Sequence, residues 1–214
     1  MNILFYYLYG GGGAVENMKI LYTALAERPS VSRLTIVCSA TSPLCELDAH
    51  PKVKLIIGDY LPFRELNRFA MATWGLKALV ARERPDVVLA MNLSSYVRLG
   101  VPTVLSVNNS YQVYPAEIAL RHPKGRIAAA VLRGFFRLAL RQADGVILQT
   151  ELMRDYTLRT AGRALPSWVI GKSVEDAADD SLQAPLEVAQ SFLQGDGRHV
   201  FSFLYAATPV QHKN

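Results

Sequence analysis

Four consecutive glycines, Gly10 to Gly13, are the residues whose type and spacing best suit ligand chemistry. They lie between an apolar run at 3–9 and a segment with helical periodicity at about 14–27. Glycines at such a bend let a ligand approach the backbone, and the N-terminus of the following helix favours negative charge. A tight turn that needs positive φ also uses glycine, but four in a row exceed that need. We therefore predict a phosphate or diphosphate cradle.

The residues around this bend argue against two common nucleotide motifs. A dinucleotide fingerprint that begins at Gly10 and Gly12 would need a third glycine where Val15 stands. The second predicted strand ends in Cys38-Ser39-Ala40, which offers no acid for a ribose, and the sequence has no G-K-S/T triplet. NAD and ATP-type sites are both disfavoured.

A second polar segment, Asn108-Asn109-Ser110-Tyr111, directly follows a predicted buried strand at 103–107. Functional loops of α/β sheets lie at such positions. These side chains can form hydrogen bonds but include no general base. The four histidines are scattered and pair with no nucleophile, so the sequence does not support triad chemistry.

A third signal is a stripe of arginines in a long predicted helix at about 125–143. Arg126, Arg133, Arg137 and Arg141 are seven, four and four residues apart, so they share one sector of the helix. The opposite side is expected to be apolar and consists of Ile127, Val131, Leu132, Phe135, Phe136, Leu138 and Ala139. The stripe is either a solvated face over a core-facing helix or a basic face that meets anionic lipid head groups.

Short β-branched runs alternate with helical stretches, which predicts a doubly wound, mostly parallel, Rossmann-like α/β sheet. Strands are expected at 3–9, 34–38, 53–57, 86–90, 103–107, 145–149 and 168–170, and helices at 14–27, 62–84, 125–143 and 151–161. We assign residues 1–171 to this domain and 172–198 to a connecting segment. A strand at 200–205 then begins a second domain at 199–214.

Composition fits a globular protein in a reducing compartment. Half of the 214 residues are apolar and only 19% are charged, which suits a sheet covered on both faces. The net charge of +5 favours anionic partners, although an ordinary surface bias also explains it. Cys38 and Cys45 form no CxxC or metal spacing, and Cys38 is expected to be a buried thiol, so we expect a cytoplasmic setting. No segment reaches the roughly 20 apolar residues that span a bilayer.

Four segments, in this order, resemble the N-terminal domain of GT-B glycosyltransferases, specifically the large retaining family 4. They are the strand and glycine run at 2–16, Arg84-Pro85-Asp86-Val87-Val88, the segment 143–151 that begins Ala-Asp-Gly-Val-Ile, and the segment 206–214 with Pro209 and Lys213-Asn214. The order of the four carries the resemblance, and it covers nearly the whole chain.

The resemblance implies two Rossmann-like domains that face a cleft, with the nucleotide-sugar mainly on the C-terminal domain and the acceptor on this one. Gly12, Gly13 and Lys213 would hold the donor diphosphate, with Glu16 anchoring the loop, and neither a metal nor a cofactor besides the donor would be needed. Asn108 stands where the family often has a histidine near the sugar. The family's arginine before the lysine is absent, since Ala207 or Thr208 lies there.

The implied function is transfer of a sugar with retention to a lipid-linked or surface-polysaccharide glycan at the inner membrane face. Asn109, Tyr111 and Tyr114 are the expected acceptor-side residues, and the four arginines the expected membrane-facing ones. No nucleic-acid partner is expected, because basic and aromatic residues do not interleave. A chain that ends at Asn214 is expected not to transfer sugar by itself.

Two other functions remain open from the sequence. The first is a non-catalytic binding module of the same fold, because Asn108 and the absent arginine could mean lost activity. The second is a nucleotide-cofactor reductase, against which Val15 and the missing ribose-binding acid argue.

Overall fold

The computed structural model describes residues 1–9, 13–46, 50–92, 95–115 and 125–170. The chain divides into two compact units, Met1–Gly171 and Lys172–Asn214. The description below concerns the first unit. Gly12, the expected linker at 172–198 and the expected second domain at 199–214 with Lys213 lie outside the described residues, as do the side chains of Glu16 and Arg126.

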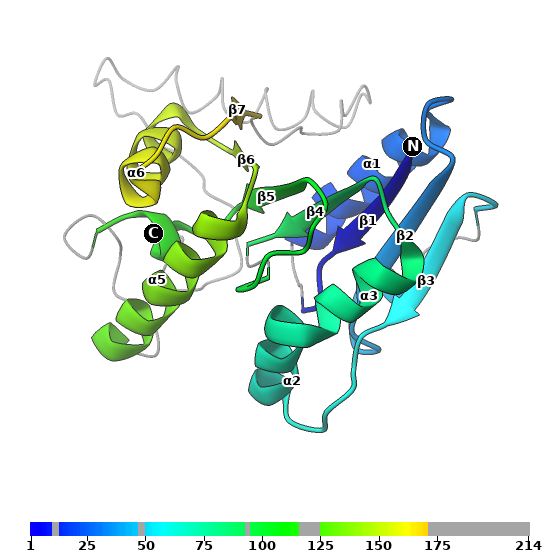
Figure 1. Ribbon diagram of the computed structural model, residues 1–214, viewed down its shortest axis with the longest axis horizontal. Coiled ribbons are helices and arrows are strands. Elements are labelled where there is room, and N and C mark those ends of the chain that lie inside the picture. The colour runs from blue at the N-terminus through cyan, green and yellow to red at the C-terminus, as the bar shows by residue number, and fades with distance from the viewer. Residues whose placement is uncertain (10–12, 47–49, 93–94, 116–124, 171–214) are drawn as a thin grey trace, which may run out of the picture. The chain divides into compact units, whose positions relative to one another are not determined.

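A seven-stranded sheet organises the first unit, in the order β3-β2-β1-β4-β5-β6-β7 (Figure 1). The strands are β1 (Asn2–Tyr6), β2 (Arg33–Cys38), β3 (Val53–Ile57), β4 (Val87–Met91), β5 (Thr103–Val107), β6 (Gly145–Leu148) and β7 (Ser167–Val169). Every pair of neighbouring strands is parallel. The predicted Rossmann-like α/β class is confirmed, and the sheet is parallel throughout the described part.

Helices connect the strands in the βαβ manner. They are α1 (Gly13–Glu27), α2 (Arg64–Ala70), α3 (Leu76–Glu83), α4 (Ser110–Val113), α5 (Gly125–Gln142) and α6 (Glu151–Ala161), with a 3₁₀ turn at Pro43–Glu46 and a π turn at Met71–Gly75. The helix predicted at 62–84 is therefore α2, the π turn and α3 in succession. The polar segment that begins at Asn108 runs into one helical turn, α4, which Asn109 caps through its side chain.

Two apolar cores lie on opposite faces of the sheet, and alternation along β1 divides them. Leu4 and Tyr6 belong to one core, which also holds the inward faces of α3, α5 and α6. Ile3 and Phe5 belong to the other, which α1 covers. Successive strand residues point to opposite faces, so a central strand that is apolar at every position must be buried on both.

The amino ends of the strands are held by acidic side chains. The Asp86 carboxylate accepts a hydrogen bond from the Asn2 amide (2.6 Å), and the Asp144 carboxylate accepts one from the Thr103 amide (2.9 Å). These bonds fix where β1 and β5 begin, because each satisfies the first amide of a strand.

Glu83 supports the same edge from the end of α3. Its side chain is 4% exposed and pairs with Lys54 on β3 (2.7 Å) and with Arg82 (2.8 Å). The hydrogen bond from Lys54 is the main cause that lowers the pKa of Glu83, although burial acts in the opposite direction.

The π turn between α2 and α3 anchors the connection that follows β4. The Thr73 hydroxyl donates to the carbonyls of Phe69 (2.8 Å) and Ala70 (3.1 Å), which compensates the widened helical turn. The Ala72 carbonyl accepts from the Tyr96 amide (2.7 Å) and the Ser95 hydroxyl (3.0 Å). The 95–101 connection is thereby tied to the helix.

Candidate functional site

The sheet reverses its winding between β1 and β4, and the carboxyl edge at this point is where open α/β sheets bind ligands. A hollow of about 160 Å³ lies there, and we call it the switch-point hollow. Residues from the ends of β1 and β4, from α2, from the segment after β5 and from α5 line it: Tyr6, Tyr7, Leu8, Tyr9, Arg68, Met91, Asn92, Asn109, Gln112 and Leu132.

Gln112 is the least satisfied polar group of this hollow. It lies on α4, is 2% exposed, and its Oε1 has no hydrogen-bond partner in the described part of the chain. A buried carbonyl without a partner costs about 1–3 kcal/mol, so native proteins retain few of them. Gln112 lines the hollow, but this oxygen has almost no accessible surface, so a ligand hydroxyl or amide bound there could supply the missing donor only after the side chain rotates.

Asn92 joins the end of β4 to the segment that follows β5. It adopts a left-handed backbone conformation with φ of 59°, which is uncommon for a residue other than glycine. Its side-chain oxygen accepts a hydrogen bond from the Asn108 amide (2.8 Å). The bond holds the segment after β5 against the end of β4, and Asn108 is thereby fixed at the carboxyl edge.

Arg68 brings a cation to the same hollow from α2. Its guanidinium lies 5.5 Å from the centre of the Tyr9 ring and pairs with Glu65 at 3.1 Å. Burial raises the pKa of Tyr6 beside it, and the charge of Arg68 only partly opposes that shift. The Tyr6 phenol therefore stays protonated at neutral pH and can act as a hydrogen-bond donor.

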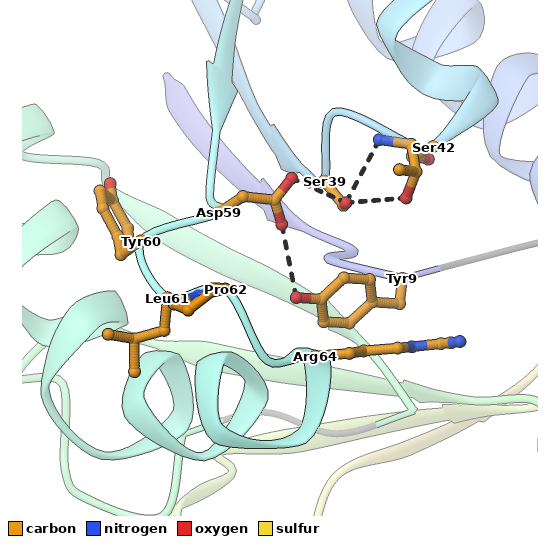
Figure 2. Close-up of a pocket in the computed structure, with 9 residues that line it drawn as sticks. Tyr9, Ser39, Ser42, Asp59, Tyr60, Leu61, Pro62 and Arg64 are labelled. Atoms are coloured by element: carbon orange, nitrogen blue, oxygen red, sulfur yellow. Dashed lines mark hydrogen bonds between the residues drawn. The ribbon is translucent and has the colours of Figure 1, made fainter.

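A second and larger hollow, of about 690 Å³, lies beside the first, and we call it the Asp59 pocket. Figure 2 shows its lining residues, which come from the ends of β1, β2 and β3 and from the start of α2. They are Tyr9, Ser39, Thr41, Ser42, Asp59, Tyr60, Leu61, Pro62 and Arg64. Tyr9 lines both hollows and so forms their common wall.

The Asp59 carboxylate organises this pocket. One oxygen accepts hydrogen bonds from the Ser39 hydroxyl (2.8 Å) and the Ala40 amide (2.6 Å). The other accepts a long bond from the Tyr9 hydroxyl (3.4 Å), as Figure 2 shows. These contacts join the ends of β1, β2 and β3.

Asn67 fixes the turn that carries Asp59. It is fully buried, and its oxygen accepts from the amides of Tyr60 (2.9 Å) and Leu61 (3.1 Å). Its amide group donates to the Gly58 carbonyl and to the Tyr9 hydroxyl, both at 2.8 Å. Asn67 therefore both closes this turn and positions Tyr9, the wall that the two hollows share.

The expected site residues fall into three groups. Asn109 lines the switch-point hollow and Asn108 lies bonded at its border. Tyr111 is 6% exposed, and burial raises the pKa of its phenol. The Tyr114 ring packs edge-on against Tyr156 with the centroids 5.6 Å apart. Neither tyrosine lines either hollow, and the acceptor role of Asn109, Tyr111 and Tyr114 stays a prediction.

Of the expected donor-phosphate residues, Gly13 is the first residue of α1, which fits an amide at a helix N-terminus. Gly12 and Lys213 lie outside the described residues. The cradle therefore stays a prediction.

The arginine stripe of α5 is not uniform. Arg133 donates to the carbonyls of Ala129 and Tyr114, both at 3.3 Å, whereas Arg137 and Arg141 are exposed. The side expected to be apolar and buried is also divided, since Phe136 and Ala139 are buried while Ile127, Val131 and Leu138 are exposed. The helix faces the core with a narrower stripe than the sequence suggested.

Sequence reasoning missed Tyr9, Asp59, Arg68 and Gln112. Asp59 had a usable signal, because it follows the predicted strand 53–57 by two residues and therefore lies where that strand's carboxyl end is expected. Tyr9 was counted as a strand residue, although β1 ends at Tyr6. Nothing in the spacing of Arg68 or Gln112 distinguishes them from ordinary helix residues.

None of the helices within the described ranges is both long and apolar enough to cross a bilayer.

Comparison with protein families gives one match, in which residues 11–175 fit the model of Glycosyltransferase Family 4. No curated protein matches the chain.

Solved structures give many matches to the fold. A putative UDP-N-acetylglucosamine 2-epimerase from Listeria monocytogenes is 17% identical with a TM-score of 0.55, and the match covers 86% of this chain and 51% of that one. UDP-GlcNAc 2-epimerase from Neisseria meningitidis, bound to UDP-GlcNAc, is 15% identical with a TM-score of 0.53, and the match covers 91% of this chain and 54% of that one. HepE from Anabaena, in complex with UDP and glucose, is 20% identical with a TM-score of 0.53, and the match covers 89% of this chain and 50% of that one. The chain therefore spans about half the length of each.

Proposed function

Because the chain belongs to Glycosyltransferase Family 4, we propose that its carboxyl edge takes part in moving a sugar from a nucleotide-sugar to an acceptor, with retention. The observation that carries this proposal is the switch-point hollow at the carboxyl edge, whose lining includes Gln112, a buried side chain with an Oε1 that has no partner in the described part of the chain. A sugar offers hydroxyl donors at several positions, so it can satisfy such an oxygen while the ring fills the space. The HepE structure holds UDP and glucose, which supports a nucleotide-sugar as the donor.

The proposed reaction breaks the bond between the anomeric carbon and the leaving diphosphate oxygen, and forms a bond from that carbon to the acceptor oxygen. Asn108 cannot take up a proton at neutral pH, so the acceptor's proton passes to the leaving oxygen. Attack on the face from which the diphosphate leaves preserves the anomeric configuration. Gly12, Gly13 and Lys213 would stabilise the charge that develops on the diphosphate, and Arg68 would add positive potential beside the sugar.

Ligand-observed nuclear magnetic resonance on the 214-residue chain tests the binding half of this proposal. In saturation-transfer measurements with UDP-glucose, we expect the glucose protons to receive more saturation than the uridine protons, because this unit would contact the sugar end. NAD is the matched control and should receive none. No transfer to UDP-glucose, or transfer to NAD instead, would contradict the proposal.

Epimerisation is a second candidate, favoured by the two structural neighbours described as UDP-N-acetylglucosamine 2-epimerases. Incubation with UDP-N-acetylglucosamine alone distinguishes it, since an epimerase changes the sugar without an acceptor. A new sugar configuration at carbon 2 would favour epimerisation over transfer. In a transfer assay with the complete enzyme, an inverted anomeric configuration in the product would contradict retention.

We also propose that α5 faces an anionic membrane, where a lipid-linked or surface-polysaccharide acceptor would be found. Ile127 is 81% exposed and Val131 52%, and the exposed arginines Arg137 and Arg141 follow on the same helix. Apolar side chains beside cations are typical of helices that lie in a lipid interface. Co-sedimentation with phosphatidylglycerol vesicles should exceed that with phosphatidylcholine vesicles. Equal sedimentation of the wild type and of Arg137→Gln/Arg141→Gln would contradict this role.

A further inference from the structure

We propose that the Asp59 pocket binds an uncharged sugar ring of the acceptor, next to the donor sugar in the switch-point hollow. This inference rests on the proposed function, and it names the chemical class of the second substrate. The pocket's volume of about 690 Å³ lies within the range of small-molecule sites, roughly 300–1,000 Å³.

The pocket offers both kinds of hydrogen-bonding group that a polyol needs. The Asp59 oxygen nearest Tyr9 has only the 3.4 Å contact with that hydroxyl, so it can accept a shorter bond from a ligand hydroxyl. The hydroxyls of Thr41 and Ser42 border the same space. Arg64 adds the donors, since it forms no ion pair in the described part of the chain.

Aromatic surface complements these polar groups. The Tyr9 ring borders the pocket, and the Arg64 guanidinium lies 4.9 Å from the ring centre, a cation–π distance that orients the side chain. In Figure 2 the Arg64 side chain runs beside the Tyr9 ring. Tyr60 is 53% exposed at the pocket's rim. Sugar rings present carbon-bound hydrogens on their faces and hydroxyls at their edges, so a site with ring faces and polar groups suits them.

The charges of the pocket favour a neutral ligand. Asp59 and Arg64 contribute one charge of each sign, so an uncharged ring can bond to both. A uronate whose carboxylate lay on the Asp59 side of the pocket would meet a like charge, which repels it.

The pocket is built before any ligand arrives. Ser39 is 2% exposed, Ser42 3% and Asn67 0%, so the residues that hold its walls are packed into the domain. Asp59 is fixed by Ser39 and Ala40, and its turn by Asn67. A site whose groups are held by such bonds loses little entropy on binding.

Tyr9 gives the pocket its relation to the reaction. It lines both the Asp59 pocket and the switch-point hollow, so rings bound in the two would be neighbours. An acceptor ring in the pocket would thereby lie beside the donor sugar whose anomeric carbon its hydroxyl must reach.

Saturation-transfer measurements on the full 214-residue chain test the inference with four methyl glycosides. Methyl β-maltoside, β-lactoside and β-cellobioside are the neutral probes, and methyl β-glucuronide is the charged one. We expect at least one neutral probe to bind, and Asp59→Asn and Arg64→Met each to weaken it tenfold or more. Asp59→Asn retains an oxygen for Ser39 and Ala40, and Arg64→Met retains contact with the Tyr9 ring. The matched control is Asp155→Asn, an exposed acid on α6, which should change nothing.

Three results would overturn the inference: no neutral probe binds, the two pocket variants bind as the wild type does, or the glucuronide binds best. Unchanged urea midpoints in the variants show that lost binding is not lost folding. UDP-glucose measured in the same samples separates the two proposals. If UDP-glucose binds and the glycosides do not, only the acceptor inference fails. If the glycosides bind through Asp59 and UDP-glucose does not, the donor proposal fails and the sugar site stands.

Discussion

The two edges of the sheet use polar residues for different purposes. At the amino edge, Asp86, Asp144 and Glu83 each have partners that are strand amides or cations, and they line neither the switch-point hollow nor the Asp59 pocket. At the carboxyl edge, within the described residues, Gln112 has an oxygen without a partner, and Asp59 has one with a single long contact. Satisfied groups stabilise a fold, whereas unsatisfied ones in a hollow are available to a ligand.

This difference between the edges shows that two of the motifs that resemble the family have a structural role. The aspartates of Arg84-Pro85-Asp86 and Ala143-Asp144-Gly145 lie at the amino edge and cap strand starts. Their presence reports a shared fold, and the chemistry lies at the opposite edge. The following changes test that division, beginning with the largest expected effect.

Asn67→Leu should cause the largest loss, because Asn67 is the carboxyl-edge residue whose hydrogen bonds are structural. Four bonds disappear and leave the turn at 58–61 without its clamp. We expect the free energy of unfolding to fall by about 3 kcal/mol. Urea denaturation measures this, and Leu66→Ala on the exposed side of α2 is the control. A decrease of less than about 1 kcal/mol in the free energy of unfolding would mean that the turn at 58–61 is stable without the Asn67 side chain.

Gln112→Met should separate binding from stability. The change removes a buried oxygen that has no partner while it keeps the side-chain length, so folding should be unaffected or gain up to about 1 kcal/mol. UDP-glucose binding should weaken at least tenfold, which corresponds to about 1.4 kcal/mol. Loss of stability together with unchanged binding would reverse the interpretation of this residue.

Asp144→Ala should lower stability without a change in ligand binding, the reverse of what is expected for Gln112→Met. Loss of the bond to the Thr103 amide should cost about 1 kcal/mol and leave saturation transfer to UDP-glucose unchanged. Asp155→Ala serves as control, because that acid lies exposed on α6. Weakened ligand binding in Asp144→Ala would show that the edges are coupled.

The smallest effect is a pH dependence at the amino edge. The pKa of Glu83 is lowered from its ordinary value of 4.5, first by the hydrogen bond from Lys54. Its contribution to stability is therefore complete above that value and declines as the pH falls through the lower, folded-state pKa. The difference in urea midpoint between wild type and Glu83→Gln should be larger at pH 7 than at pH 3. An equal difference at both pH values would indicate that the pairing with Lys54 is not what stabilises the edge.

Most of the fold could be predicted from the sequence, because capping residues and apolar runs determine where helices and strands begin and end. Glu151–Ala161 matched the prediction at both ends, since Thr150 caps its first turn and Gly162 ends it in a left-handed conformation with φ of 63°. The strand at Val53–Ile57 also matched, although three of its residues are exposed at the sheet's edge.

The candidate site was less accessible to such reasoning. Asn108 and Asn109 were found because they follow a strand, and the structure brings Asn109 to the hollow. Arg68 and Gln112 reach that hollow from helices 44 residues apart in the sequence, so only tertiary packing brings them together. Whether the side-chain carbonyl of Gln112 has a hydrogen-bond partner depends on all the residues packed around it. A single sequence does not show which residues those are.

The π turn at Met71–Gly75 takes up one residue more than regular α-helical winding would hold. If one residue there were deleted, regular α-helical winding could return while α2 and α3 keep the faces they present, and the carbonyls of the turn would be taken up by amides of the helix. The Ala72 carbonyl would then leave the Tyr96 amide and the Ser95 hydroxyl. Family members that are one residue shorter here must secure this loop in another way, and sequence alignments should place their gap inside the helix.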